Sequence, residues 1–364
     1  MSDIVISGYY GFRNSGDDAL LMSIIKELKE KQPDIDIVVL SKNPKETREI
    51  YNVRAVAREN VFGMIYEIMK AKMLISGGGT LMQDSTSTKS LLYYLSIINI
   101  ALAFNKKVML YANGIGPLRV KKNRERVRKT LEKVDVITLR DSDALNELEK
   151  TGVSTPYIEV TADPAFNLNI TDDKTAPVFK ELESDKKYML VSVREWSGAG
   201  KNLTAAVAQT CDYAFERYGL TTVFLPMQLQ KDLKITQEIR SCMKNNSVLI
   251  NERYTIDEQL SVIKNMHICI GMRLHTLIYA AAMCVPHIGI VYDPKINGFL
   301  DYIGSDSYCN ASDITEDKLI SELDACMSNY EQIKDKLLSD KQRLGEKADR
   351  NAELATELLK RRKK

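Results

Sequence analysis

Short apolar runs with the composition of β-strands alternate with helical runs along almost the whole chain, and this alternation limits the fold more than any other feature. The first run, DIVISGYY, leads through a glycine-containing turn into GDDALLMSIIKELKEK, whose apolar residues keep helical spacing. The runs DIVVL, KMLISGGG, KVMLYANGIG, VDVITLR and YIEVTADPAF follow, and Gly, Asn and Asp gather at their ends. Strands that alternate with helices predict a parallel sheet with helices on both faces.

A polar, turn-prone stretch between Asn167 and Lys187 interrupts the alternation, which restarts with YMLVSVREW, TTVFLP, SVLIN, MHICIGMRLH and HIGIVYD. Because 364 residues exceed the size of one typical domain, we expect two. The predicted fold class is α/β and GT-B-like, with two doubly wound Rossmann-like domains that face a central cleft. The expected boundaries are 1–170 for the N-terminal domain, 185–330 for the C-terminal domain, and 331–364 for a helical segment with a basic tail.

Composition favours a cytoplasmic protein. A formal net charge of +2 gives no reason to expect nucleic acid as a partner. The six cysteines form no CxxC pair, so we interpret them as reduced thiols and not as a disulfide framework or a zinc site. MSDIVISGYYGF lacks the basic start of a signal peptide. The longest apolar stretch, LLYYLSIINIALAF, is shorter than a membrane span of roughly 20 residues, so we expect a buried helix there, with membrane contact as the alternative.

Two glycine-containing motifs follow strands in the N-terminal half. In GYYGFRNSGDDA, Asn14 or Ser15 can cap the next helix, and Asp17 and Asp18 suit its positive N-terminus. Beyond that structural role, such acids could hold sugar hydroxyls or act as a base. ISGGGTLMQD places three glycines after a strand, where either a tight turn or a ligand that meets backbone amides would explain them. YANGIGP repeats the arrangement one strand later.

The first motif, GYYGFRNSGDDA, is not a phosphate-binding loop of the Walker type, because no GKS or GKT follows, and it does not match GxGxxG. The segment LRDSDA contains a DxD pattern that holds a metal in some glycosyltransferases. We interpret Asp141 and Asp143 as acids in the first turn of a helix and expect no metal site.

Cationic residues follow three strands of the C-terminal half. Arg194 lies in SVREW, Arg273 and His275 lie in MRLH, and Asp293 and Lys295 lie in VYDPK. Each could belong to a surface ion pair. Because several cations would meet at one edge of a parallel sheet, the pattern favours a site for a small polyanion, to which the planar fork of arginine is suited. His267 and His287 lie within apolar strands, and we interpret both as structural.

The ordered set GYYGFRNSGDDA, ISGGGTLMQD, YANGIGP, TADPAF, SVREW and GMRLHTLIYA resembles the polysaccharide pyruvyltransferases, most of all the CsaB type, which pyruvylates bacterial cell-wall polymers. The motifs extend from about residue 4 to residue 295 and therefore cover both halves. The glycine triplet alone is weak, whereas RLH is the most specific piece.

The resemblance implies a GT-B-like fold and phosphoenolpyruvate as the donor. It implies a pyruvyl ketal across O4 and O6 of β-N-acetylmannosamine on a lipid-linked precursor of a secondary cell-wall polymer, the kind that anchors S-layers, with release of phosphate. Donor-binding roles carry over to Arg194, Arg273, Leu274 and His275, and we add Lys295. No metal or cofactor is expected, since phosphoenolpyruvate is a substrate.

The catalytic candidates are His275 and Asp17, as acid and base. The acceptor is expected on the N-terminal domain. Its candidate residues are Tyr10, Asn14, Asp18, Gly78, Gly79, Gln83, Asp84 and Asn113.

Two alternatives from other classes stay open. A GT-B nucleotide-sugar glycosyltransferase would use the same cations against a diphosphate and would release a nucleoside diphosphate. A non-catalytic sugar-binding protein would release nothing. The tail LLKRRKK is either solvated or drawn to an anionic membrane, at roughly 1 kcal/mol per cation near the surface, so association with the inner face of the membrane is a further expectation.

Overall fold

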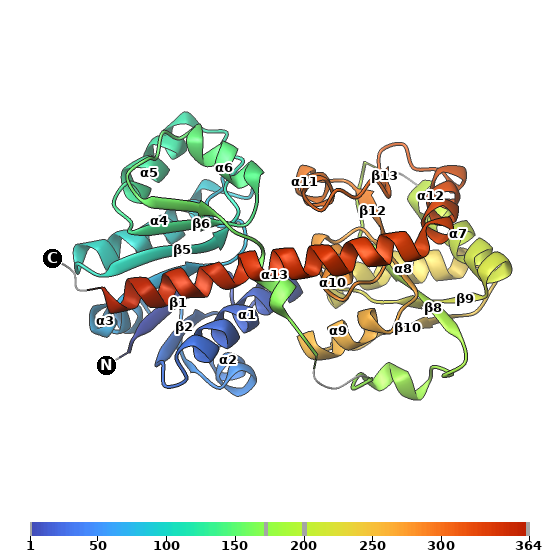
Figure 1. The fold of residues 1–364 in the computed structure, drawn as a ribbon, viewed down its shortest axis with the longest axis horizontal. Coiled ribbons are helices and arrows are strands. Elements are labelled where there is room, and N and C mark those ends of the chain that lie inside the picture. The colour runs from blue at the N-terminus through green and yellow to red at the C-terminus, as the bar shows by residue number, and fades with distance from the viewer. Residues whose placement is uncertain (1, 171–173, 199–201, 362–364) are drawn as a thin grey trace. The chain divides into compact units, whose positions relative to one another are not determined.

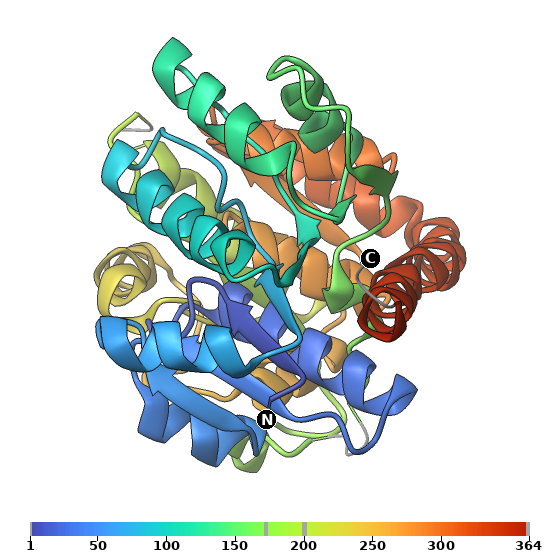
Figure 2. The ribbon, with the colours of Figure 1, turned by 90° about the vertical axis from the view of Figure 1, so that its left-hand side faces the viewer.

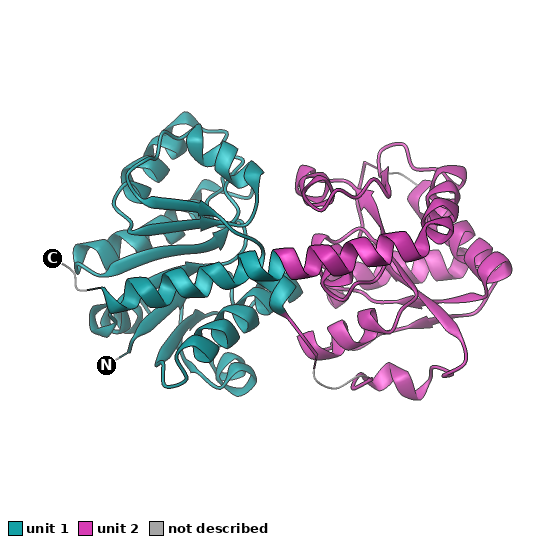
Figure 3. Cartoon of the chain, viewed as in Figure 1, with its two compact units in different colours: residues 1–167, 344–364 teal, residues 168–343 magenta. Residues whose placement is uncertain are grey.

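Two parallel β-sheets carry the fold in the computed structural model, which describes residues 2–170, 174–198 and 202–361 (Figure 1). The chain divides into two compact units (Figure 3). Unit 1 contains residues 1–167 and 344–364, and unit 2 contains residues 168–343. The expected separate segment 331–364 is therefore shared between the units: its first part belongs to unit 2 and its last part to unit 1.

Unit 1 contains a seven-stranded sheet in the order β3-β2-β1-β4-β5-β6-β7, and all of its strand pairs are parallel. Its strands are β1 (Ile4–Ser7), β2 (Ile37–Ser41), β3 (Arg54–Ala57), β4 (Met73–Gly77), β5 (Lys107–Asn113), β6 (Val136–Leu139) and β7 (Tyr157–Val160). Its helices are α1 (Ser15–Lys31), α2 (Pro44–Tyr51), α3 (Val61–Lys70), α4 (Thr88–Ala103), α5 (Lys121–Leu131), α6 (Ser142–Glu149) and the 3-10 turn η1 (Pro164–Asn167).

Unit 2 contains a six-stranded parallel sheet in the order β10-β9-β8-β11-β12-β13. Its strands are β8 (Lys187–Ser192), β9 (Leu220–Phe224), β10 (Ser247–Leu249), β11 (Ile268–Gly271), β12 (His287–Val291) and β13 (Tyr308–Asn310). Its helical elements are η2 (Pro177–Lys180), α7 (Asn202–Tyr218), α8 (Leu229–Cys242), α9 (Ile256–Lys264), α10 (Leu274–Ala282), α11 (Pro294–Tyr302), α12 (Glu316–Ser328) and α13 (Tyr330–Lys360), the last of which continues into unit 1.

The predicted α/β class with two doubly wound units is confirmed, and burial explains why the sequence specifies it. The central strands β1, β2, β4, β5 and β6 are buried at every residue, as strands covered by helices on both faces must be. In unit 1, residues of α3, α4 and α5 pack on one face of the sheet, and residues of α1 and α13 pack on the other (Figure 2). The apolar stretch around Leu91 is the buried helix α4, as predicted.

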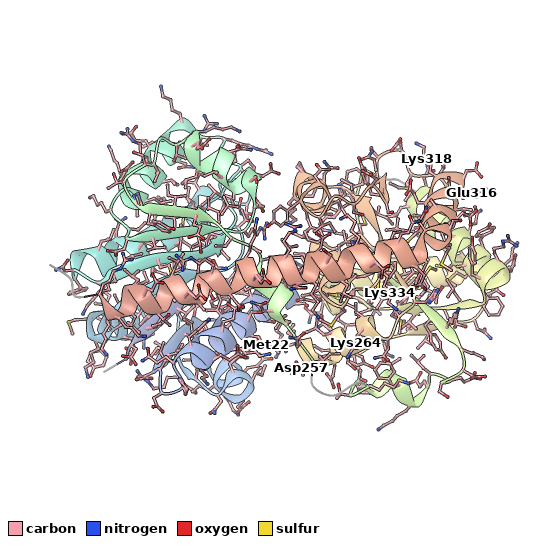
Figure 4. The ribbon with its side chains drawn as sticks, viewed as in Figure 1. Met22, Asp257, Lys264, Glu316, Lys318 and Lys334 are labelled. Carbon is pink, nitrogen blue, oxygen red and sulfur yellow. The ribbon has the colours of Figure 1, made fainter. Side chains whose placement is uncertain are left out.

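Local capping sets where the helices begin. In α9, Thr255 and Glu258 form a reciprocal capping box. Asp257 lies in the first turn and Lys264 ends the helix, so both charges complement the helix dipole (Figure 4). Similar side-chain caps start α1 at Asn14 and α6 at Asp141.

Each sheet has one point at which the chain reverses its direction of travel across the sheet. In unit 1 the chain moves from β1 to β2 on one side and later adds β4 to the other side of β1. In unit 2 the same reversal separates β8 from β11. Ligands of open α/β sheets bind beyond the carboxyl ends of the strands at such a switch point. The motifs beginning at Gly8 and Ile75 follow β1 and β4, and those containing Arg194 and Arg273 follow β8 and β11.

A buried carboxyl group joins α1 to α13 inside unit 1. Glu27 accepts a hydrogen bond from the Tyr111 hydroxyl, and the Asn167 side chain donates to Glu27 Oε1 and to Asp349 Oδ1, each at 3.0 Å. Burial raises the pKa of Glu27 to about 8, although both hydrogen bonds to its carboxylate act in the opposite direction. The folded protein therefore keeps this group protonated at neutral pH.

The stability of the protein should depend on this group in a defined pH window. Below pH 4.5 the Glu27 carboxyl is protonated in both states; between pH 4.5 and about 8 only the unfolded chain ionises, so stability is lost as pH rises. Glu27→Gln removes this term. Its free energy of unfolding relative to wild type should rise by a few kcal/mol from pH 5 to pH 8, at about 1.4 kcal/mol per pKa unit. Urea unfolding at both pH values measures this change, with exposed Glu49→Gln on α2 as control. Parallel pH profiles for Glu27→Gln and wild type would contradict the assignment.

Candidate functional site

Three neighbouring strands of unit 2 deliver the cationic motifs to one edge of the sheet. Gly271 at the end of β11 is in register with Ser192 of β8 and with Gly289 of β12. Arg194 and Arg273 each come two residues after the end of their strand, so they flank the switch point. This carboxyl edge of the second sheet is called the unit 2 edge below.

Arg273 is held by a carboxylate that the sequence did not point to. Its Nε donates to Asp232 Oδ2 at 3.1 Å, and its Nη2 donates to Asp232 Oδ1 at 2.5 Å. The Asp232 side chain is fully buried in the first turn of α8, and its Oδ2 also accepts the backbone N–H of Gln228 at 2.9 Å. In the sequence, Asp232 is an acid that suits a helix N-terminus and nothing more. Its ion pair could not be predicted, because its partner Arg273 lies 41 residues away.

Arg194 is held by an aromatic residue that the sequence motifs did not indicate either. Its Nη1 donates to the Tyr292 hydroxyl at 2.9 Å, and its guanidinium carbon lies 5.0 Å from the centroid of the Tyr292 ring. Tyr292 directly follows β12, and its ring lies 6.3 Å from that of Trp196. In VYDPK the sequence pointed to Asp293 and Lys295. The structure shows that Tyr292 of this motif holds Arg194, which follows β8.

His275 is the second residue of α10, and Leu274 is the first. Arg273 still has extended backbone geometry at the N-cap, with φ −92° and ψ 129°. Because α10 begins at Leu274, the strand rule that residues two apart share one side does not apply to Arg273 and His275. Leu274 is buried at 6% exposure, and the His275 ring lies 6.0 Å from that of Tyr279.

Lys295 has the geometry of a surface ion pair. Its Nζ lies 3.7 Å from Asp293 Oδ2, and 48% of its side chain is exposed. Asp293 caps α11 by accepting the backbone N–H of Lys295 at 3.1 Å. A donor-binding role of Lys295 stays a prediction.

The other two histidines occupy structural positions, as interpreted from the sequence. His287 is buried on β12, and burial lowers its pKa to about 4, so it is neutral at physiological pH. His267 stacks on Tyr330 with ring centroids 4.2 Å apart, and burial lowers its pKa as well.

The switch point of unit 1 brings the first two glycine motifs together. The Asn14 side chain caps α1 by accepting the N–H of Gly16 at 3.3 Å, and Asp17 and Asp18 lie in the first turn. Gly78 and Gly79 adopt φ of +67° and +71°, which side chains rarely tolerate. A Cβ atom on Gly79 would lie 2.9 Å from Asp17 Oδ1, so these motifs meet here. This carboxyl edge of the first sheet is called the unit 1 edge below.

Tyr10 does not have the surface position expected of an acceptor-binding residue. Its side chain is 1% exposed in the core of unit 1, and its hydroxyl donates to Gly77 O at 2.5 Å. Tyr9, its neighbour, is 39% exposed. Successive side chains in this turn point in opposite directions, and the sequence did not indicate which of the two tyrosines faces solvent.

Asp84 and Gln83 organise their own loop. The Asp84 carboxylate accepts the backbone N–H groups of Arg119 and Val120, at 2.8 and 2.9 Å, and the Asn123 side chain at 3.0 Å. Burial raises the pKa of Asp84, but these hydrogen bonds outweigh it and leave that pKa below its usual value. Gln83 bonds within the same loop to Ser85 and Thr86. Both residues therefore have structural roles, and contact with an acceptor stays a prediction.

Asn113 is fully buried at the end of β5, where its side-chain nitrogen donates to Ser76 O and Tyr111 O, each at 3.0 Å. Its Oδ1 has no hydrogen-bond partner among the described residues. The geometry gives Asn113 a role in joining β4 to β5, and its acceptor-binding role stays a prediction.

The DxD pattern has the structure that its sequence suggested. Asp141 caps α6 by accepting the N–H of Ala144 at 2.7 Å, and Asp143 lies in the first turn. Arg140 lies 3.1 Å from Asp141 and 3.9 Å from the buried Asp163. Over the described ranges, no cluster of three His, Cys, Asp or Glu residues is suited to a metal ion. None of the helices in that part of the chain is long and apolar enough to span a bilayer.

The fold is of the GT-B-like α/β class, and the family of the chain is identified from its sequence as a whole. The model of the polysaccharide pyruvyl transferase family matches residues 14–294, most of the chain, so the chain belongs to this family of transferases for polysaccharide pyruvylation. The matched range includes both switch points and ends within VYDPK.

A curated relative is the amylovoran biosynthesis protein AmsJ of Erwinia amylovora, which is 21% identical and is matched over 91% of this chain and 93% of its own length. Among solved structures, the UDP-GlcNAc 2-epimerase of Methanocaldococcus jannaschii has a TM-score of 0.68 at 13% identity, over 98% of this chain and 99% of its own. The UDP-GlcNAc 2-epimerase of Neisseria meningitidis, bound to UDP-GlcNAc, has a TM-score of 0.66 at 13% identity, over 99% of both chains. These likenesses show a GT-B-like fold and nothing of the substrate.

Proposed function

We propose that the protein transfers a pyruvyl group from phosphoenolpyruvate to a sugar and releases phosphate. The acceptor proposed is β-N-acetylmannosamine on a lipid-linked precursor of a secondary cell-wall polymer, ketalated across O4 and O6. The observation that carries the donor assignment is the pair Arg194 and Arg273 on either side of the switch point of unit 2. Phosphoenolpyruvate has a carboxylate and a phosphate, which two arginines can bind by charge-assisted hydrogen bonds.

The chemistry needs proton transfer and electrostatic stabilisation. A proton adds to the vinyl carbon of phosphoenolpyruvate, which becomes the methyl group, and a sugar hydroxyl adds to the central carbon with loss of its own proton. Phosphate then leaves with the electron pair of its C–O bond, and the second hydroxyl closes the ketal by adding to the same carbon as it loses its proton, which the departing phosphate can accept. We assign the proton donor, or the hydrogen bond to the departing phosphate, to His275 at the start of α10. Asp17 at the unit 1 edge is the proposed base.

The contacts within unit 2 suggest how Arg273 would meet the donor. Nε and Nη2 of the Arg273 guanidinium donate to Asp232, so an oxygen of phosphoenolpyruvate would contact Nη1. Asp232 therefore acts in this proposal as a group that orients Arg273, and Tyr292 orients Arg194 in the same way. Ligand-binding arginines whose rotamers are fixed in advance lose less conformational entropy on binding.

Incubation with phosphoenolpyruvate and a synthetic lipid-linked disaccharide that ends in N-acetylmannosamine tests the proposal. Phosphate release, together with a gain of one pyruvyl ketal in the mass of the acceptor, is expected. A parallel incubation with UDP-sugars covers the glycosyltransferase alternative, which would release UDP. Acceptor binding with neither product would identify a sugar-binding protein.

We also propose peripheral contact with an anionic membrane, through which a lipid-linked acceptor would be reached. On α3, Val61, Phe62, Tyr66 and Met69 are exposed, with Phe62 at 88%. Of the two charged residues of α3, Lys70 is exposed, whereas Glu67 is largely covered and paired with Arg54. Bulky apolar side chains beside a cation suit a helix lying in the interface of an anionic bilayer. Arg362, Lys363 and Lys364 of the basic tail lie outside the described residues.

The double variant Phe62→Ser, Tyr66→Ser should lose most of its binding to vesicles of anionic phospholipid in a sedimentation assay. Each apolar side chain withdrawn from the bilayer costs about 1.5–3 kcal/mol at most. Leu338→Ser, which changes a leucine 62% exposed on α13, serves as the matched control. Undiminished sedimentation of the double variant at low salt would contradict a role of α3 in membrane contact.

A further inference from the structure

The exposed side chain of Tyr9 is stacked on an aromatic neighbour at the unit 1 edge. The rings of Tyr9 and Phe12 lie nearly parallel, with centroids 4.0 Å apart and an interplanar angle of 3°. Both residues belong to the turn between β1 and α1, which is directly beyond the switch point. Tyr9 is 39% exposed, although such a large ring could be buried like that of Tyr10.

Side chains from two other elements support this stack. Arg58 follows β3, and its guanidinium carbon lies 4.9 Å from the centroid of the Phe12 ring and 4.2 Å from that of Tyr93 on α4. A guanidinium placed over aromatic faces is attracted by them, and the contact is stronger where solvent is excluded. The ring of Tyr9 therefore rests on a preformed support. The conformational entropy lost in ordering this ring is lost during folding and not when a ligand binds.

Polar groups that suit a sugar lie next to the stack. The negative charge of Asp17 is near enough to help burial raise the pKa of the Tyr9 hydroxyl. A Cβ atom built on Gly79 would lie 2.9 Å from Asp17 Oδ1. The Asp17 carboxylate is therefore adjacent to the backbone of the glycine triplet. An exposed aromatic ring, a carboxylate and a bare backbone thus meet at one place.

We propose that Tyr9 is a stacking platform for the pyranose ring of the acceptor, with Asp17 beside its hydroxyl groups. A pyranose has a face of C–H bonds, which an aromatic ring can cover, and a rim of hydroxyls, which a carboxylate can accept. A small polyanion such as phosphoenolpyruvate has no such apolar face and would be repelled by Asp17. This assignment deepens the proposed function and rests on it for the identity of the acceptor.

Three variants test the platform with a water-soluble acceptor saccharide. Tyr9→Ala should raise the KM for the acceptor about tenfold, whereas kcat and the Kd of phosphoenolpyruvate should stay close to wild type. Tyr9→Phe retains the ring and should retain the KM. Tyr157→Ala, which removes another exposed tyrosine of unit 1 at the start of β7, is the matched control and should change neither constant.

An unchanged acceptor KM in Tyr9→Ala would overturn the proposal. So would a Tyr9→Phe variant as impaired as Tyr9→Ala, since the hydroxyl and not the ring would then be the contact. Binding of the saccharide alone, measured by saturation-transfer NMR without donor, separates the two levels of inference. If wild type binds the saccharide and Tyr9→Ala does not, the platform stands even where no pyruvyl transfer is found.

Discussion

Replacing Arg273 by lysine is expected to abolish most of the affinity for phosphoenolpyruvate, nearly as completely as replacement by alanine. Arg273 meets Asp232 through two nitrogens, at 2.5 and 3.1 Å, and the Asp232 side chain has no exposed surface. Lysine keeps the positive charge but has one nitrogen, so it cannot satisfy both carboxylate oxygens and still face a ligand. Disruption of a charge-assisted contact in such a place costs about 2–5 kcal/mol.

The measurement is the Kd of phosphoenolpyruvate by calorimetry, at a temperature where thermal unfolding shows the variant to be folded. The temperature matters because breaking a buried ion pair also destabilises the fold. Arg240→Lys is the matched control: Arg240 likewise uses two nitrogens, toward Ser247 Oγ and Ser247 O at 3.0 Å each, and these join α8 to β10 away from the unit 2 edge. Full donor affinity in Arg273→Lys would show that net charge alone matters at this position.

His275→Gln is expected to retain donor binding and to lose roughly 10²–10⁴ in turnover, the range that general acid–base catalysis contributes. Glutamine preserves much of the size and hydrogen-bonding capacity of histidine but cannot transfer a proton near neutral pH. The position at the start of α10 puts the ring at the same edge as Arg273, the residue just before the helix. Phosphate release measured beside donor calorimetry separates the chemical step from binding.

His267→Gln provides the control, because His267 is also partly buried in unit 2 but stacks on Tyr330. It should leave turnover nearly unchanged. Near-normal turnover of His275→Gln would exclude the proton role, and a loss confined to donor affinity would instead identify His275 as a phosphate ligand.

Sequence alone determined the class of fold and the edges at which the site residues lie. Apolar runs of strand length that alternate with amphipathic helices can bury their surfaces only as parallel sheets covered on both faces. Residues that follow such strands must lie at the carboxyl edge, which is why Arg194 and Arg273, and Asp17 in the first turn of α1, could be placed at these edges without coordinates. Helix caps such as Asn14 and Asp141 were also predictable, because capping is a local interaction within four residues.

Only the tertiary structure decided which partners those residues have and which neighbours face solvent. Asp232 and Tyr292 contact Arg273 and Arg194 across 41 and 98 residues of sequence. The strand order brings the segments after β9 and β12 to the same sheet edge, each one strand removed from the strand that carries its arginine. Tyr9 and Tyr10 are adjacent residues of the same type, yet the backbone of one turn exposes the side chain of the first and buries that of the second. A periodic pattern fixes the faces of strands and helices, but it does not extend into turns, where side-chain direction follows from dihedral angles that long-range packing selects.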